Sequence, residues 1–237
     1  MPFSQAISEA RNGIVAIVRI RQLPNNQFNV AICGSAWCIV KNKFLVTAHH
    51  IFNEGLARDV NDKFLVFSVP QNGPAAFHVP VVSFPLEDNT NDIAIIEIDT
   101  SVNPSFQVQN IPVTFRSHQD GEKVLTLGFP APQIFNANID ANSSWLGGNM
   151  FLKSYANEGM ISGQFDLEGQ YMYEFNVGWY QGESGGPILS LNPTAVFSIM
   201  QVYRNVATPH GVVPGPHQGR SLAQIENHLR RLGATIV

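Results

Sequence analysis

Three short segments of the sequence carry side chains that could act together as a nucleophile, a base and an acid. They read TAHH at residues 47–50, ND at 91–92 and GESGGP at 182–187. A serine hydroxyl is a weak nucleophile that needs a base within hydrogen-bond distance to take its proton. Histidine supplies such a base near neutral pH, and a buried carboxylate holds the imidazole in the required tautomer. We therefore predict that the base, the acid and the nucleophile are His50, Asp92 and Ser184.

The glycines around Ser184 favour a site for a developing negative charge. Glycine adopts backbone dihedrals that direct neighbouring N–H groups toward one point. Such donors stabilise the oxyanion that forms during acyl transfer, and removal of one donor costs roughly 2.7–4 kcal/mol of transition-state stabilisation. We predict that the backbone amides of Gly182 and Ser184 form this oxyanion hole.

Each of these residues also has an ordinary structural interpretation. A shift of one residue would exchange His49 and His50; the pattern of the segment favours His50 and leaves His49 a structural or surface role. Asp92 could cap a turn beside Asn91, and the glycine-rich segment could be a plain loop. A metal site would draw its ligands from His49, His50, His78 and Cys33. Their spacing matches no known ligand pattern, so we expect no metal and no organic cofactor.

The elements that must position these side chains are mostly short strands. Apolar, β-branched or aromatic runs bounded by turn residues occur at 15–21, 28–41, 44–47, 64–69, 77–84, 92–98, 123–129, 150–163, 171–177, 187–191 and 196–204. A Pro/Asn-rich connection at 99–112 divides them into two sets. This pattern predicts an all-β barrel or sandwich fold. Helices are predicted only near the two ends, at 4–12 and 221–232. The second of these segments has its apolar residues on one face.

Composition excludes several classes of protein. The 237 residues are 44% hydrophobic, which is enough for a core and argues against disorder. Lys and Arg number 14 against 18 Asp and Glu, so the formal charge is −4, and no basic run suggests nucleic acid. No apolar stretch is long enough for a transmembrane span, and we expect no signal peptide. Cys33 and Cys38 are expected to be unbonded thiols, which favours a cytoplasmic location.

The three segments resemble those of the chymotrypsin-like serine protease family. Residues 47–50 resemble its TAAH, residues 91–94 (NDIA) its DIAL and residues 182–187 its GDSGGP, in the same order along the chain. Residues 121–130 (GEKVLTLGFP) and 159–163 (GMISG) resemble the HtrA-type bacterial branch, here expected without a PDZ domain. The resemblance covers residues 13–232.

This resemblance implies an all-β, trypsin-like fold of two six-stranded antiparallel β-barrels with a C-terminal helix on the second. The whole chain, 1–237, would be one peptidase domain. Its N-terminal barrel would span about 13–110 and carry His50 and Asp92. The C-terminal barrel would span about 120–237 and carry Ser184 and the helix.

The resemblance also implies a set of substrate contacts. Gly178, six residues before Ser184, would lie at the base of the primary pocket near Trp179 and Met200. Since no acid stands there, we expect an apolar or medium-sized side chain before the scissile bond. Arg220 near the pocket wall would instead favour an acidic one. Ser198 would line the substrate channel and bond Asp92.

One departure from the family concerns regulation. The sequence contains no IVGG-like segment, so we do not expect activation by cleavage. Glu183 nevertheless occupies the position at which cleaved family members use an acid to bind the freed amino terminus. A buried carboxylate without a partner is costly. We expect Glu183 to find an internal cation or solvent, or to regulate the oxyanion hole through its pairing.

Taken with the resemblance, these features predict a serine endopeptidase that acts on protein or peptide through an acyl-enzyme. Since a protease in a bacterial cytoplasm must be restrained, the enzyme could be inactive alone and switched on by an activating protein partner. The alternative is a catalytically silent pseudoprotease of the same fold that holds an extended peptide along a strand edge.

Overall fold

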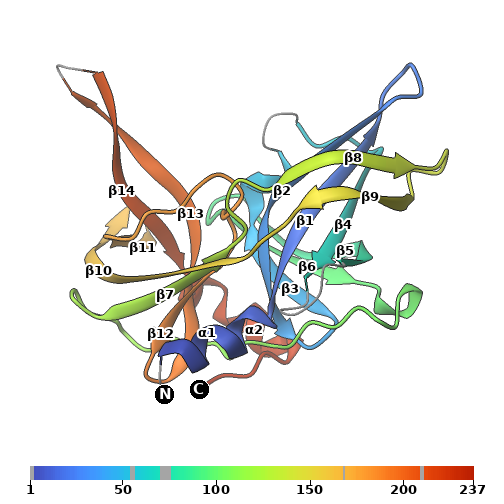
Figure 1. Cartoon of the computed structure of the whole chain (residues 1–237). Coiled ribbons are helices and arrows are strands. Elements are labelled where there is room, and N and C mark those ends of the chain that lie inside the picture. The colour runs from blue at the N-terminus through green and yellow to red at the C-terminus, as the bar shows by residue number, and fades with distance from the viewer. Residues whose placement is uncertain (1–2, 54–56, 70–75, 168, 209–210) are drawn as a thin grey trace.

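The computed structural model of the chain contains two closed β-barrels that lie side by side (Figure 1). It describes residues 3–53, 57–69, 76–167, 169–208 and 211–237. The first barrel has the strand order β1-β2-β3-β6-β5-β4. Its strands are β1 (Ile14–Gln22), β2 (Phe28–Val40), β3 (Phe44–Ala48), β4 (Asp62–Ser68), β5 (Phe77–Asp88) and β6 (Ile93–Ile98).

The second barrel has the strand order β10-β11-β14-β13-β12-β7. Its strands are β7 (Lys123–Gly128), β10 (Tyr155–Leu167), β11 (Gln170–Phe175), β12 (Pro187–Leu191), β13 (Thr194–Thr208) and β14 (Gly211–Ser221). Neighbouring strands in both barrels run antiparallel. The predicted fold of two six-stranded antiparallel barrels is therefore confirmed.

Strand β3, which carries the chain to His50, is buried along its whole length. All five residues of β3 are buried, which explains why this strand is a continuous apolar run and does not alternate with polar residues. One apolar cluster includes Leu45 and Ile96 of the first barrel together with Leu127 and Ile199 of the second. The two barrels thus share a core, and segments at their junction are held from both sides.

The α-helices of the described chain lie at its two ends, as the sequence predicts, and two short 3-10 helices, η1 (His49–Phe52) and η2 (Thr100–Val102), lie between them. The N-terminal helix α1 covers Phe3–Arg11. At the C-terminus the chain forms a 3-10 turn, η3 (Leu222–Ile225), which leads into α2 (Glu226–Leu232). Ser221 begins this segment, and its hydroxyl accepts a hydrogen bond from Ala223 N. Buried Leu222, Ile225 and Leu229 fasten the helix to the shared core.

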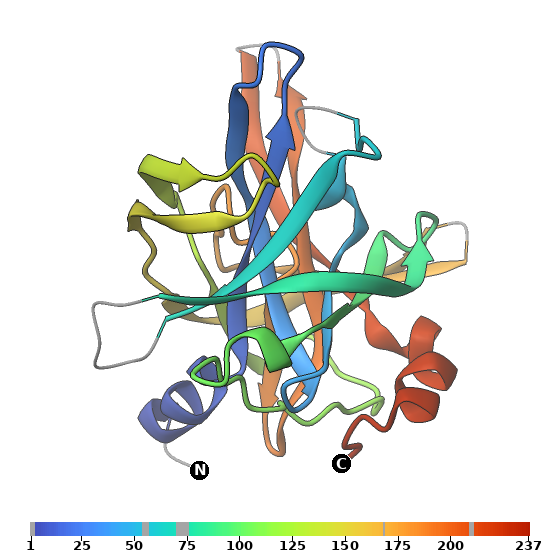
Figure 2. The same ribbon diagram turned by 90° about the vertical axis from the view of Figure 1, so that its right-hand side faces the viewer.

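A two-stranded hairpin lies outside both barrels and was missed by the sequence analysis. It consists of β8 (Gln133–Ile139) and β9 (Trp145–Phe151), and it crosses the outer face of β1 and β2 (Figures 1 and 2). The run predicted at 150–163 is in fact divided between β9 and β10. Trp145 anchors the hairpin, with its ring edge-on to Phe67 at 5.2 Å between centroids. Because most residues of β8 are exposed or half-buried, its sequence lacks a strong strand pattern.

Two further expectations concern cysteines and membrane spans. Neither Cys33 nor Cys38, both within the described chain, takes part in a disulfide. Burial raises the pKa of the Cys38 thiol to about 12, which keeps it protonated and unreactive. Among the described helices, none is long and apolar enough to cross a bilayer.

A core aromatic connects the first barrel to the segment that carries His50. Phe52 is fully buried in the 3-10 helix η1 (His49–Phe52), with edge-on contacts to Phe64 and Phe84 at 4.9 and 5.0 Å. We expect Phe52→Ala to lower the free energy of unfolding by about 3–5 kcal/mol, since it opens a cavity among these rings. Urea denaturation measures the loss.

The matched control for this prediction is Val60→Ala, because the Val60 side chain is 96% exposed. Its effect should stay within about 0.5 kcal/mol. Equal losses in the two variants would contradict the assignment of Phe52 to a packed core.

Candidate active site

Strand pairing in the first barrel brings His50 and Asp92 together. His50 follows β3 and Asp92 precedes β6, and these antiparallel strands pair with Ala48 opposite Ile93. The last residue of one strand therefore faces the first residue of the other. The His50 Nδ1 and Asp92 Oδ2 atoms lie 2.7 Å apart, and His50 N donates to Asp92 Oδ1 at 2.7 Å. A carboxylate at Nδ1 stabilises the tautomer that leaves Nε2 able to accept a proton.

Asp92 adopts a backbone conformation that most residues avoid. Its φ is +53°, in the left-handed region that aspartate and asparagine tolerate best among residues with a side chain. The Asp92 carbonyl accepts from His49 N at 3.1 Å and from Gln201 Nε2 at 3.1 Å. The Gln201 amide also donates to the carbonyl of Asn91 at 3.0 Å. The second barrel thus holds the turn that presents the Asp92 carboxylate.

Ser184 lies in the turn that leads into β12 and is docked on the first barrel. Its carbonyl accepts from Ser35 N at 2.8 Å, and the Ser35 hydroxyl donates to Gly182 O at 2.7 Å. Gly182 and Gly185 have φ values of +96° and +82°. A side chain at Gly185 would also collide with Thr47 and with the carbonyl of Ser35. Glycine is therefore required there both by the backbone and by the close approach of the barrels.

The Ser184 hydroxyl donates to a main-chain carbonyl, that of Gln201, at 3.1 Å. Gln201 therefore touches both halves of the site, because its side chain holds the 91–92 turn while its carbonyl contacts Ser184. Within the described residues no hydrogen bond engages the amides of Gly182 and Ser184. These two N–H groups are accordingly available to a ligand.

The predicted bond from Ser198 to Asp92 is wrong, and Gln201 contacts the 91–92 turn instead. The Ser198 hydroxyl is buried and has no hydrogen-bond partner among the described residues, so it does not bond Asp92. Gly185 N donates to Met200 O, and Met200 N donates to Gly186 O, both at 2.8 Å. This pairing places residue 201 beside Ser184.

The other predicted pocket residues lie on the second barrel with different exposures. Gly178 is exposed, and Trp179 is buried, with its ring 4.8 Å from that of His217 and its main-chain N donating to His217 Nδ1 at 3.3 Å. Met200 is fully buried in the core of the second barrel. The substrate contacts predicted for Gly178, Trp179 and Met200 stay predictions.

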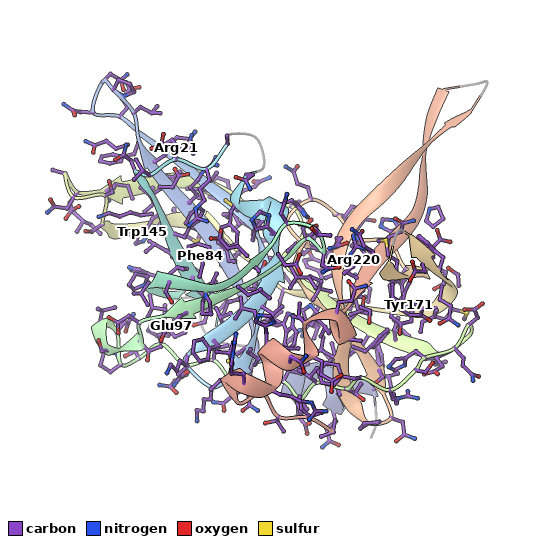
Figure 3. All side chains as sticks on the ribbon, turned by 180° about the vertical axis from the view of Figure 1, so that it is seen from behind. Arg21, Phe84, Glu97, Trp145, Tyr171 and Arg220 are labelled. Carbon is purple, nitrogen blue, oxygen red and sulfur yellow. The ribbon has the colours of Figure 1, made fainter. Side chains whose placement is uncertain are left out.

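Arg220 interacts electrostatically with the turn that carries Asp92. It is buried on β14, where the second barrel approaches the first (Figure 3). Burial lowers the pKa of the Arg220 guanidinium, and the charges of Asp92 and Asp88 oppose that change. Its positive charge therefore acts on the 88–92 turn. An attraction of Arg220 for an acidic substrate side chain stays a prediction.

Glu183 departs from the two simplest expectations. Its side chain is fully buried, so it does not reach solvent, and no described cation forms an ion pair with it. Oε2 accepts from Tyr180 N at 2.6 Å, whereas Oε1 has no partner among the described residues. Burial raises the pKa of this carboxyl to about 7.

The remaining histidines do not gather around a common point. His49 Nε2 lies 3.9 Å from Glu87 Oε1, whereas the His78 ring stacks on Phe67. In the described part of the chain, no group of three or more His, Cys, Asp or Glu side chains could hold a metal ion. His50 is thus the histidine whose ring contacts the Asp92 carboxylate.

Comparisons with known proteins agree with this architecture. The family model described as Trypsin matches residues 17–213. Among solved structures, an HtrA-type protease, AlgW with decapeptide, matches with a TM-score of 0.65 and 13% sequence identity. The match covers 98% of this chain and 67% of that one. At this identity the likeness concerns the fold alone. No curated protein matches the sequence.

The amide of Gln201 can be tested apart from any activity. We expect Gln201→Leu to lower the free energy of unfolding by about 1–3 kcal/mol, because the carbonyls of residues 91 and 92 lose a donor. Ser198→Ala is the matched control on the same strand. Its buried hydroxyl has no partner among the described residues, so its removal should be neutral within about 0.5 kcal/mol or stabilising. Urea denaturation of both variants measures the difference, and the reverse order would restore the original assignment.

Proposed function

Because this chain belongs to the trypsin family, we propose that it is a serine endopeptidase that cleaves peptide bonds through an acyl-enzyme. The observation that carries the proposal is the 2.7 Å contact between His50 Nδ1 and Asp92 Oδ2, beside a Ser184 docked on the same barrel. A binding module of this fold would need neither the paired imidazole and carboxylate nor a serine in a glycine turn. The pseudoprotease alternative is for that reason not favoured.

The first step would form an ester at Ser184. Its Oγ attacks the scissile carbonyl carbon while its proton passes to Nε2 of His50, and Asp92 stabilises the imidazolium. For this transfer the hydroxyl must exchange its present acceptor, Gln201 O, for the imidazole. Catalytic hydrogen bonds of this kind are often completed only when substrate binds.

The oxyanion and the leaving group complete the cycle. The amides of Gly182 and Ser184 would donate to the oxyanion of the tetrahedral intermediate. The imidazolium then gives its proton to the leaving amine as the C–N bond breaks. Water, activated by the same imidazole, hydrolyses the ester and restores the Ser184 hydroxyl. The amine leaves with the proton that came from Ser184, and Ser184 regains a proton from the water, so the cycle consumes one water and requires no cofactor.

The proposed substrate is an extended protein or peptide segment, and an activating protein partner remains part of the proposal. No ion pair engages Glu183 within the described residues, and we propose that such a partner acts on the turn around it. Nucleic acid and membranes have no place in this proposal, since its chemistry requires only a peptide bond.

The proposal predicts a covalent adduct on one serine. A fluorophosphonate should add a single label to the native chain and none to Ser184→Ala, as measured by intact mass. An unlabelled but folded native chain would point to a silent site or to a missing partner. Addition of candidate partners would then separate these two cases.

The choice between the adjacent histidines predicts a second difference. His50→Ala should slow labelling by at least about a thousandfold, because the hydroxyl loses its base. His49→Ala, the matched control, should label within a few-fold of the native rate, since the His49 ring faces Glu87. Equal loss in both variants would contradict the assignment of the base to His50.

A further inference from the structure

The Glu183 carboxyl occupies an enclosed position directly before the proposed nucleophile. Its Cβ and Cγ pack on Gly128 at the end of β7, and its main-chain N donates to Tyr180 O at 3.0 Å. Gly182 in the same turn packs against the carbonyl of Phe129 and the ring of Pro132. The carboxyl therefore cannot reach water unless the 180–184 turn moves.

The surroundings of this carboxyl hold no compensating charge. The Glu183 side chain contacts Gly128 at the end of β7 and the backbone of its own 178–186 turn, and the loop that follows β7 packs on the adjacent Gly182. Residues 124–132 and 175–186 contain one ionisable side chain besides Glu183. It is the phenol of Tyr180, which is mostly exposed. One donor, Tyr180 N, serves Oε2, and no described group serves Oε1. An isolated buried carboxylate is far more costly than a neutral carboxylic acid in the same place.

We propose that Glu183 is a positioning residue that works uncharged. In its protonated form the carboxyl accepts the Tyr180 amide and keeps the 180–184 turn closed. Loss of the proton places an unpaired charge in the enclosed site and drives the turn open toward water or a cation. The amides of Gly182 and Ser184 then leave the geometry of the oxyanion hole. This inference rests on the function proposed for Ser184.

The direction of the pH effect follows from the buried position. The Glu183 pKa rises from 4.5 to about 7 on folding, so the folded chain binds more protons than the unfolded chain between these values. The contribution of Glu183 to stability is therefore fully present below pH 4.5. It declines as the pH rises to about 7 and stays lost above that value. The fraction of molecules with a closed 180–184 turn should decrease over the same pH range.

The first experiment compares the native chain with Glu183→Gln, a neutral side chain of the same shape. The fluorophosphonate labelling rate of the native chain should rise at acid pH, as the base loses its proton, and then fall roughly tenfold for each pH unit above about 7. Glu183→Gln should keep the acid limb and lose the alkaline fall. Glu158→Gln, an exposed carboxyl on β10, should follow the native profile.

Two results would overturn the proposal. A Gln variant that fails to label at any pH would show that the charged carboxylate is required. A Gln variant with the native alkaline fall would assign that fall to another group. Labelling of the Gln variant on the alkaline side, where the native chain is slow, supports it.

The second experiment does not depend on activity. The midpoint of thermal unfolding, measured from pH 4 to 9, should fall between about pH 4.5 and 7 in the native chain relative to Glu183→Gln. A constant difference over that range would overturn an uncharged Glu183. If the native chain never labels, either alone or with candidate partners, but shows this fall, the proposed function fails while the protonated carboxyl stands.

Discussion

The hydrogen bond from Ser35 N to Ser184 O joins the two barrels at the point on which the site depends. The Ser35 hydroxyl extends this contact, since it donates to Gly182 O and accepts from Phe129 N at 3.0 Å. The proposed nucleophile therefore has its position set by the barrel that carries the proposed base. Gly185 makes the approach possible because any side chain there would collide with that barrel.

A second constraint acts within the first barrel. The pairing of β3 with β6 brings His50 to Asp92, but the carboxylate is presented by a turn with an unfavourable φ. Such a conformation persists only where surrounding contacts determine it. Here the contacts come from His49 N and from the amide of Gln201 on the second barrel. Each barrel thus completes the geometry of the other, which ties the proposed catalysis to the docking of the barrels.

Buried charge is distributed unevenly around this junction. The buried Arg220 guanidinium acts on the turn that holds Asp92, so one side of the site carries opposite charges. Glu183, on the other side, has only one backbone donor and no charged partner in the described chain. Asp92 has a positive charge nearby and Glu183 has none among the described residues, so a proton or a cation that binds at this site is expected to act on Glu183. That asymmetry connects the fold to the regulation proposed for the turn.

The strand-rich fold, the terminal helices and the three segments that bear His50, Asp92 and Ser184 can be predicted from the sequence, because strand patterns and glycine turns are local properties. The tertiary structure alone shows that Gln201 and not Ser198 holds the 91–92 turn, because this contact depends on the pairing of Met200 with Gly185 and Gly186 and on the docking of the two barrels. It also decided that Glu183 is enclosed without an ion pair. The sequence left open a cation, solvent or regulation, because burial depends on segments far apart in the chain. The β8–β9 hairpin was missed for a related reason, because its few apolar side chains are buried only by packing on the outer face of the first barrel.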